Sequence, residues 1–367
     1  MTIPEANRQP GEQDIDARRP WLLLGLVLAS FFGLCTATLF LPHDPYVRYQ
    51  QLASTLHFRT VWTYERLAFD KTPIDIAIIG NSRLQSAIAA PVVQARLREK
   101  LGRDVHVANL SMPQEGRNAH YVIAQELFKH HPEVKLVLLS AIEAMPRESH
   151  PAFRNIAEVG TIFGSPVLIN RAFLDDLAFV PYRQMSLFVQ TRFPEAFGLR
   201  QFSRADYYGT DFDTSQSFVS PTSGVVDRER AGPVDELRRT ARERVQSITP
   251  AVLPAALAPA EFAVEYHYTR AIADLAMANG TGIGFIYLPI FENPEPLRQA
   301  SFYRGLGPVV NAPCIAGRPD IFLDYGHLTR PGAHEISRTI SDVLVEAGWI
   351  VSDNVNTAEN LEVNLCR

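Results

Sequence analysis

The chain of 367 residues is 46% apolar and 20% charged, and it contains three cysteines. This length and composition can bury one large core or two modest ones, which excludes a disulfide-stapled miniprotein and a disordered chain. The formal net charge of -5 leaves no broad basic surface to neutralise phosphates, so no nucleic-acid partner is expected.

An uncharged apolar segment near the start of the chain is typical of a transmembrane helix. Residues 21–41 carry no charge, and at 1.5 Å per residue their helix would be about 30 Å long, the thickness of the hydrocarbon core. Arg18 and Arg19 precede it, and the residues after it are no richer in basic side chains. The positive-inside rule therefore predicts that residues 1–20 are cytoplasmic and that the bulk of the chain is extracytoplasmic.

The alternative is a cleaved signal peptide. The apolar segment is long for the hydrophobic region of such a peptide, and the stretch from Cys35 to Ala37 makes a poor cleavage site. Cys35 also lacks the preceding residues of a lipoprotein cysteine. An uncleaved anchor is therefore favoured.

Residues 42–72 are a mixed aromatic and polar stretch, interpreted as a linker that lifts the soluble domain off the membrane. In residues 73–145, the first part of the predicted core, short apolar β-branched runs alternate with helical periodicity. This alternation is typical of a parallel sheet with helices on both faces. The predicted strands here are residues 74–79, 105–110 and 134–139, and the predicted helices are residues 92–101 and 120–130.

Residues 146–261 break the alternation and are interpreted as an inserted helical cap. The α/β pattern returns in residues 262–350, the second part of the core. Its predicted elements are a helix at 262–278, a strand at 283–288 and a helix at 333–347. Residues 351–367 form a polar tail.

Ser82 follows the first predicted strand, in the string Gly80-Asn81-Ser82-Arg83. A turn from a strand into a helix holds a side chain at the carboxyl edge of a sheet with its hydroxyl exposed, which suits a nucleophile. A serine at such a position can equally cap the helix that follows. The turn alone leaves both interpretations open.

Asp324 and His327 lie three residues apart, just before the helix that Pro331 and Gly332 introduce. A hydroxyl nucleophile needs a base, and the base needs a carboxylate that orients it. If the loop folds back on itself, it can present this pair to a serine at another strand end. The alternative is a capped helix with a surface histidine.

The two motifs together resemble those of the SGNH/GDSL hydrolase superfamily. Gly80-Asn81-Ser82-Arg83 is similar to its first block, and Asp324-Tyr325-Gly326-His327 is similar to its last. The resemblance covers residues 73–145 and 262–347. It implies a three-layer α/β/α, flavodoxin-like parallel sheet, in which Ser82 forms an acyl-enzyme, His327 is the general base and acid, and Asp324 orients His327.

The single membrane anchor and the sequence around His327 most resemble those of one membrane-anchored branch of this superfamily. Proteins of that branch serve O-acetylation of exopolysaccharides or D-alanylation of teichoic acids. The resemblance implies an acyl donor supplied by a multi-pass membrane acyltransferase, a polysaccharide acceptor, and a location on the bacterial inner membrane with the C-terminal domain in the periplasm. It implies no cofactor and no metal.

Two blocks depart from the family pattern. Where the family has a glycine whose N–H binds the oxyanion, this chain has Ser111, so the backbone N–H groups of Ser82 and Ser111 are the expected oxyanion hole. The asparagine of the third block is missing after the strand at 134–139. Losing one such donor costs roughly 10²-fold or more in rate, so a catalytically inactive homologue remains an alternative.

Other motifs carry less weight. Gly280-x-Gly282-x-Gly284 precedes a strand, which is the wrong context for a dinucleotide loop. No partner at metal-ligand spacing accompanies His130 and His131. A disulfide between Cys314 and Cys366 is one option in an oxidising compartment.

The sequence thus predicts a membrane-anchored serine acyltransferase that O-acetylates an envelope polysaccharide. A carbohydrate esterase with the same triad and a non-catalytic SGNH-fold assembly factor for polysaccharide export are the alternatives.

Overall fold

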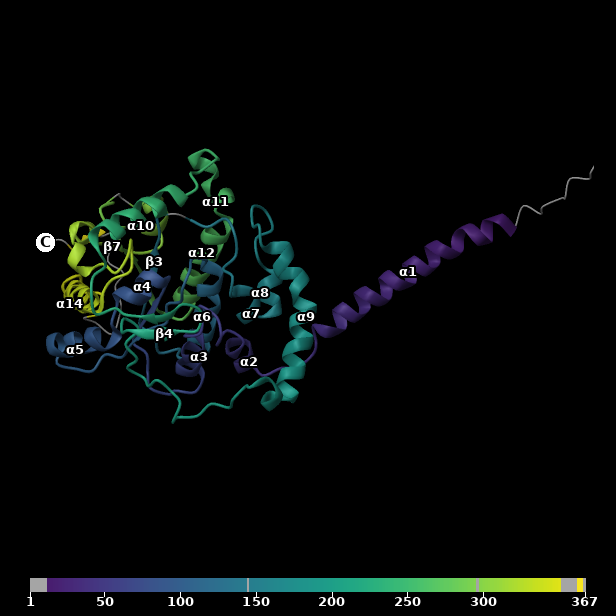
Figure 1. The fold of residues 1–367 in the computed structure, drawn as a ribbon, viewed down its shortest axis with the longest axis horizontal. Helices are drawn as coiled ribbons and strands as arrows, with labels where there is room; N and C mark the ends of the chain where they lie inside the picture. Colours follow the sequence, from purple (N-terminus) through teal and green to yellow (C-terminus); the bar gives the residue numbers. More distant parts are fainter. Residues whose placement is uncertain (1–11, 144, 295–296, 351–361, 366–367) are drawn as a thin grey trace, which may run out of the picture.

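Short apolar segments of the chain form a parallel sheet that positions everything else. A computed structural model describes residues 12–143, 145–294, 297–350 and 362–365 (Figure 1). Five strands lie in the order β2-β1-β3-β6-β7, all parallel, and β8 adds a sixth parallel strand beside β7. The strands are β1 (Ile76–Ile79), β2 (Val107–Asn109), β3 (Leu136–Ala141), β6 (Gly282–Tyr287), β7 (Val309–Asn311) and β8 (Glu362–Asn364).

The predicted α/β class with a parallel sheet is confirmed, and all four predicted strands fall in it. β7 and β8 were not predicted. β7 is only three residues long, and β8 lies in the segment interpreted as a polar tail. Neither is long enough to give a clear hydrophobic period.

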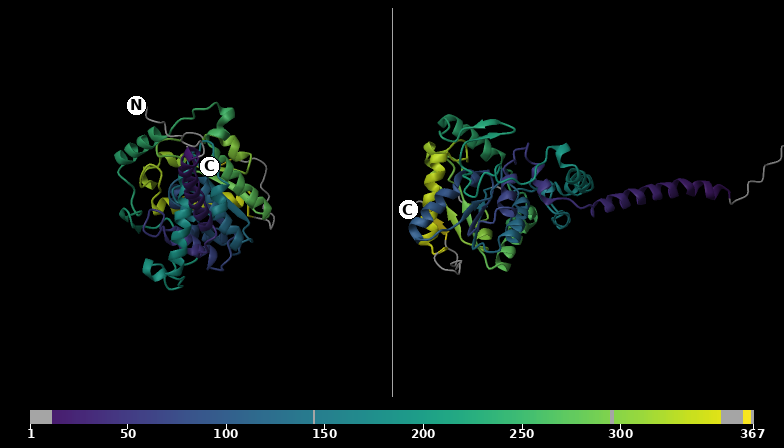
Figure 2. Two further views of the ribbon diagram at one scale, coloured as in Figure 1. Left: turned by 90° about the vertical axis from the view of Figure 1, so that its right-hand side faces the viewer. Right: turned by 90° about the horizontal axis from the view of Figure 1, so that it is seen from below.

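Helices cover both faces of the sheet, which gives three layers (Figures 1 and 2). On one face lie α3 (Thr60–Ala68), α6 (Arg117–His130) and α12 (Ala263–Ala278). On the other lie α4 (Ser82–Ala87), α5 (Ala90–Leu101) and α14 (Arg330–Glu346).

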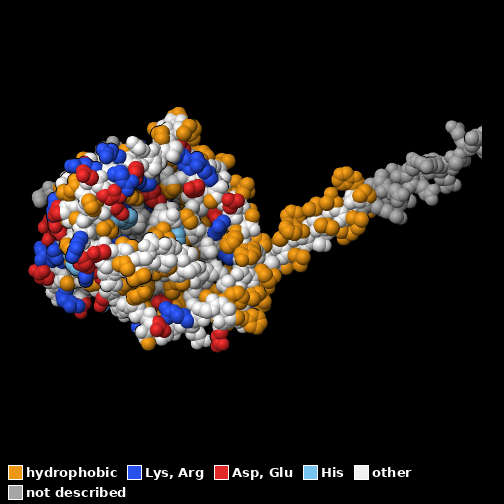
Figure 3. Space-filling view, in the orientation of Figure 1, with side chains coloured by type: hydrophobic (Ala, Val, Ile, Leu, Met, Phe, Trp, Pro, Cys, Tyr) orange, Lys and Arg blue, Asp and Glu red, His pale blue; other side chains and the backbone are white. Residues whose placement is uncertain are grey.

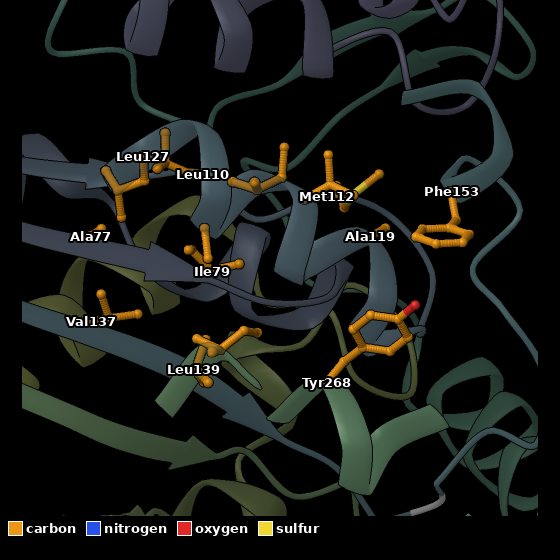
Figure 4. Packing of buried hydrophobic residues seen from close by; sticks show 14 of the residues in the cluster. Ala77, Ile79, Leu110, Met112, Ala119, Leu127, Val137, Leu139, Phe153 and Tyr268 are labelled. Carbon is orange, nitrogen blue, oxygen red and sulfur yellow. The ribbon is translucent and has the colours of Figure 1, made fainter. Parts of the chain in front are cut away.

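Alternate side chains of each strand enter different cores because successive residues of a strand point to opposite faces. Ile76 and Ile78 of β1 belong to the core under α5 and α14, whereas Ala77 and Ile79 belong to the core under α6 and α12. Figure 4 shows Ala77, Ile79 and neighbouring side chains packed together in the second of these cores. All four residues of β1 are buried, so the strand that leads to Ser82 is fixed from both sides.

Residues 42–72 do not form the expected linker. They fold into α2 (Pro45–Gln50) and α3, and their large side chains are buried in the core beside α6. Tyr46, Tyr49 and Trp62 are each at most 3% exposed. The aromatic residues that made this stretch look irregular are the ones that pack it onto the domain, because each buries a large apolar area.

Residues 146–261 also pack against the domain. Phe153 and Ile156 join one core, and Leu237 and Ala241 join the other. The segment includes an antiparallel hairpin as well as helices. Its elements are α7 (Phe153–Ile156), α8 (Val159–Phe163), α9 (Phe173–Arg192), η1 (Pro194–Phe197), β4 (Phe218–Ser220), β5 (Gly224–Val226), α10 (Val234–Ser247), η2 (Ala255–Leu257) and α11 (Ala258–Glu261). The remaining short helices of the chain are α13 (Ala300–Arg304), η3 (Pro313–Gly317) and η4 (Pro319–Ile321).

One apolar helix, α1 (Glu12–Thr38), projects away from the domain (Figures 1 and 2). Its part Pro20–Thr38 has a mean hydropathy of 1.9 and is not buried, so it is apolar enough and long enough to cross a membrane. A signal sequence would meet the same criteria. Figure 3 shows the apolar side chains that cover this helix.

Cys314 is disulfide-bonded, and Cys35 is a free thiol. Cys366, the partner predicted for Cys314, lies outside the described residues.

Candidate active site

Ser82 lies at the carboxyl end of β1, where the chain turns into α4. Asn81 caps that helix: its Oδ1 accepts hydrogen bonds from the backbone N–H groups of Arg83, at 3.1 Å, and Leu84, at 3.3 Å. The capping role considered for Ser82 therefore belongs to Asn81. Ser82 is the first residue of the helix, and its hydroxyl is available for another partner.

The turn depends on Gly80. A Cβ atom at this position would lie 2.8 Å from the Cβ of Ser140 on β3 and 2.8 Å from a methyl group of Leu84. Real Cβ atoms do not approach other atoms so closely. Glycine thus allows β1, β3 and the start of α4 to meet, and this fixes the position of Ser82.

The structure brings Ser82, His327 and Asp324 together. His327 Nε2 lies 2.8 Å from Ser82 Oγ, and His327 Nδ1 lies 2.7 Å from Asp324 Oδ2. A carboxylate accepts only, so His327 Nδ1 carries the proton of this bond and Nε2 can accept from the serine hydroxyl. The arrangement has the geometry expected of a nucleophile, a base and an orienting carboxylate.

The loop between Asp324 and His327 folds back as the sequence required. Asp324 Oδ1 accepts hydrogen bonds from the backbone N–H groups of Gly326, at 3.0 Å, and His327, at 2.9 Å. Burial alone would raise the pKa of Asp324, but the His327 ring and these N–H groups lower it to about 2. Asp324 is therefore a carboxylate at neutral pH.

The side chain of Arg83 packs against the loop between Asp324 and His327. A Cβ at Gly326 would lie 2.5 Å from Arg83 Cδ, so the glycine allows the loop to rest on the arginine side chain. Arg83 is buried and pairs with Glu143, which also accepts from Arg244 at 3.0 Å. Burial would raise the pKa of Glu143, but these two arginines hold it below its usual value. Arg83 and Arg244 also line the cavity that contains Ser82.

The structure does not give Ser111 the predicted role in the oxyanion hole. Its backbone N–H points to Asn109 Oδ1 at 3.2 Å, and its carbonyl accepts from Gln85 Nε2 at 2.6 Å. Asn109 is the last residue of β2, and its side chain folds over the next residues in the manner typical of asparagine. Ser111 is 3% exposed and does not line the cavity described below.

The backbone N–H of Ser82 is the other expected oxyanion donor. As the first residue of α4 it has no acceptor within the helix. Where the resemblance to the SGNH/GDSL pattern would place an asparagine, the chain has Ser140, which packs against Gly80, and the segment that ends in Glu143.

A cavity of about 590 Å³ opens in front of Ser82. Figure 3 shows this face hollowed between α10 and the β4–β5 hairpin. Its walls come from segments far apart in the sequence, including the loop after β2, the hairpin and the loop that carries His327. The residues that line the cavity include Arg59, Ser82, Arg83, Glu115, Ser223, Arg228, Arg244, Asp324 and His327.

Charged side chains other than the predicted ones surround the serine. On one side, Arg244 lies between Glu143 and Glu115, and burial raises the pKa of Glu115. Arg59 and Arg228 also line the cavity. Sequence reasoning missed Arg59, Arg228 and Arg244 because they come from segments interpreted as a linker and a cap, and no local spacing joins them to Ser82.

No protein-family model matches the sequence, and no curated protein matches it. The functional interpretation therefore depends on the geometry of Ser82, His327 and Asp324.

Proposed function

We propose that the protein is a serine acyltransferase that works through an acyl-enzyme on Ser82. The observation that carries the proposal is the continuous chain of hydrogen bonds from Asp324 through His327 to Ser82, with 2.7 Å and 2.8 Å between the atoms. Such an arrangement activates a hydroxyl that is otherwise a poor nucleophile at neutral pH.

In the first half of the proposed reaction, Ser82 Oγ attacks the carbonyl carbon of the acyl donor while His327 Nε2 takes the serine proton. The Ser82 N–H stabilises the oxyanion. The bond to the leaving group breaks, and His327 returns the proton to it. In the second half, His327 removes a proton from a hydroxyl of the acceptor, whose oxygen attacks the carbonyl carbon of the Ser82 ester. The bond between this carbon and Ser82 Oγ breaks, His327 returns the proton to Ser82 Oγ, and the acylated acceptor leaves.

The sheet supports the proposal that the chain belongs to the SGNH/GDSL superfamily with a flavodoxin-like fold. When the first five strands of the sheet are numbered in their order along the chain, they lie in the order 2-1-3-4-5, the order of flavodoxin-like folds. In such sheets ligands bind beyond the carboxyl ends of the strands, where the strand order reverses. Here that point lies between β1 and β3, and Ser82 directly follows β1.

The proposed acceptor is a hydroxyl group of an envelope polysaccharide or exopolysaccharide, and the proposed modification is O-acetylation. In this proposal α1 anchors the protein in the bacterial inner membrane and the domain lies in the periplasm. A multi-pass membrane acyltransferase would deliver the acyl group across the bilayer.

An esterase would use the same triad with water as the acceptor. The one observation that favours a non-catalytic assembly factor is that the Ser111 N–H is bonded to Asn109 rather than free for an oxyanion.

The acyl content of the envelope polysaccharide distinguishes these functions. In cells that lack the protein, we expect the content of ester-linked acetyl groups to fall and to be restored by the wild type but not by Ser82→Ala. A rise in acetyl content would indicate an esterase. An equal rescue by Ser82→Ala would indicate an assembly factor. Ser223→Ala, a serine of the same cavity without a triad partner, is the matched control.

A further inference from the structure

Two arginines of the cavity lie side by side, and no carboxylate of the described residues forms a direct ion pair with either. Arg59 and Arg228 are each 4% exposed, and both line the cavity that holds Ser82. Within the described residues neither forms an ion pair. A buried charge without a counter-charge is costly, so such a pair calls for an explanation.

Other buried arginines of the chain are balanced. Arg83 pairs with Glu143, and Arg117 pairs with Glu265 at 2.7 Å. Arg183 has no ion pair within the described part of the chain, but it donates to two backbone carbonyl groups and to a side-chain amide oxygen. Arg59 and Arg228 have no ion pair within the described residues and share a single backbone carbonyl as acceptor.

The hydrogen-bond donors of the pair are largely unused. Each guanidinium has five N–H groups. Arg59 Nη1 donates to the carbonyl oxygen of Thr214 at 2.8 Å, and Arg228 Nη1 donates to the same oxygen at 3.3 Å. The Nε and Nη2 atoms of Arg59 and the Nε atom of Arg228 are buried without a partner among the described residues. One shared carbonyl therefore serves two cations.

An aromatic ring holds both guanidinium groups in place. Arg59 lies over the ring of Phe218 with its guanidinium carbon 4.0 Å from the ring centroid, and the corresponding distance for Arg228 is 5.2 Å. Phe218 belongs to β4 of the hairpin at the cavity wall. Cation–π contact stabilises a guanidinium but supplies no hydrogen-bond acceptor.

Both groups nevertheless remain cations at neutral pH. Burial, followed by the charge of Arg228, lowers the pKa of Arg59 to about 9. Burial lowers the pKa of Arg228 to about 10, although the negative charges of Asp324 and Asp213 oppose this. The cavity that holds Ser82 thus carries two positive charges.

We propose that Arg59 and Arg228 form a subsite for an anionic oxygen-bearing group, a carboxylate or a phosphate, on the acceptor that is acylated at Ser82. Paired guanidinium groups match the oxygens of such a group and bind it through charge-assisted hydrogen bonds. The assignment of this anion to the acceptor rests on the proposed function, whereas anion binding itself does not.

The subsite is joined to the loop of the triad. The backbone carbonyl of Arg228 accepts a hydrogen bond from the N–H of Arg330 at 2.6 Å, and Arg330 is the first residue of α14, three residues after His327. An anion held by Arg228 would therefore lie at a fixed place relative to His327. We infer that it orients the acceptor so that a neighbouring hydroxyl faces the acyl-enzyme.

Calorimetric titration of the full chain in detergent micelles tests the subsite. The Ser82→Ala variant is titrated with tetragalacturonate, with its methyl ester and with inorganic phosphate, so that no turnover is required. We expect at least one anionic probe to bind more tightly than the methyl ester, by about tenfold or more. Tighter binding of tetragalacturonate assigns a carboxylate, and tighter binding of phosphate assigns a phosphate group.

Substitutions in the same background locate the binding. Arg59→Gln and Arg228→Gln should each weaken binding of the anion by about tenfold or more and leave the weak binding of the methyl ester unchanged. Arg228→Lys keeps the charge but not the planar fork of the guanidinium group. Its affinity for the anion should therefore lie between that of Ser82→Ala alone and that of Arg228→Gln. Arg183→Gln, a buried arginine that does not line the cavity, is the matched control and should bind as Ser82→Ala does.

The subsite is overturned if neither anion binds better than the ester, or if both Arg→Gln variants bind the anion as tightly as Ser82→Ala alone does. Comparison of the probes on Ser82→Ala without a further substitution keeps the test decisive even if one Arg→Gln variant does not fold. A Ser82 that does not react with acyl donors would refute the proposed function while leaving this binding result intact.

Discussion

His327 Nε2 lies 2.8 Å from Ser82 Oγ although 245 residues separate them in the chain. Two separate local features of the structure produce this contact. The turn after β1 fixes Ser82 through Gly80 and Asn81, and the Asp324 carboxylate folds the loop that carries His327. A substitution can remove each feature alone, so the contribution of each to the contact between His327 and Ser82 can be measured.

Asp324→Asn should slow acylation of Ser82 by roughly 10³- to 10⁴-fold, the loss known for a serine triad whose aspartate becomes an amide. An asparagine can donate to His327 Nδ1 and so favours the wrong tautomer of the ring. The measurement is the rate of release of p-nitrophenol from p-nitrophenyl acetate. Asp320→Asn, an exposed aspartate that pairs with Arg318, is the control and should retain the wild-type rate. Equal rates for wild type and Asp324→Asn would remove Asp324 from the mechanism.

Gly80→Ala should destabilise the fold by about 1–3 kcal/mol, because the new methyl group would lie against Ser140 and Leu84. The measurement is chemical denaturation followed by circular dichroism. Gly160→Ala in α8 has no atom within 4 Å of the new Cβ, so it should leave the free energy of unfolding unchanged or raise it by up to about 1 kcal/mol. Similar effects of the two substitutions would contradict the close approach at Gly80.

Glu143→Gln should reduce the free energy of unfolding by about 3 kcal/mol, because it leaves Arg83 buried without its counter-charge. Because Arg83 supports Gly326, we also expect slower acylation of Ser82. Denaturation and the p-nitrophenyl acetate rate measure the two effects. Glu99→Gln, which removes an exposed ion pair with Arg96, should cost less than about 1 kcal/mol. A cost as small at Glu143 would mean that its ion pair is not structurally important.

Asp70 makes stability depend on pH. Burial would raise its pKa, but hydrogen bonds from Thr72, Thr210 and Tyr207 hold it well below the usual value. A lowered pKa in the folded state stabilises the fold above the unfolded value of about 3.9, and this stabilisation is lost as the pH falls below it.

Asp70→Asn should therefore lower the melting temperature at pH 7, and its difference from the wild type should shrink as the pH falls below about 4. Thermal unfolding across that range measures this difference. Asp206→Asn, an exposed aspartate of the same region, should follow the wild-type curve. A difference between Asp70→Asn and wild type that stays constant with pH would contradict the role of the carboxylate charge.

The sequence predicted the sheet and the proximity of Asp324 to His327 because their signals are local. The four predicted strands are short apolar runs, and the short spacing of Asp324 and His327 implies a folded-back loop. The sequence did not predict that the N–H of Ser111 donates to the side chain of Asn109, because this contact depends on the path of the chain after β2. Arg59 and Arg228 were missed because only tertiary structure brings them to one cavity.

If Ser82 is an activated nucleophile, it should react with a fluorophosphonate. Treatment of the full chain in detergent with such a reagent, followed by intact-mass measurement, shows whether it does. We expect one adduct per chain in the wild type and in Ser223→Ala, none in Ser82→Ala, and much slower labelling of His327→Ala. A folded wild type that takes up no label, or a Ser82→Ala variant that is labelled as fast as the wild type, would contradict this expectation.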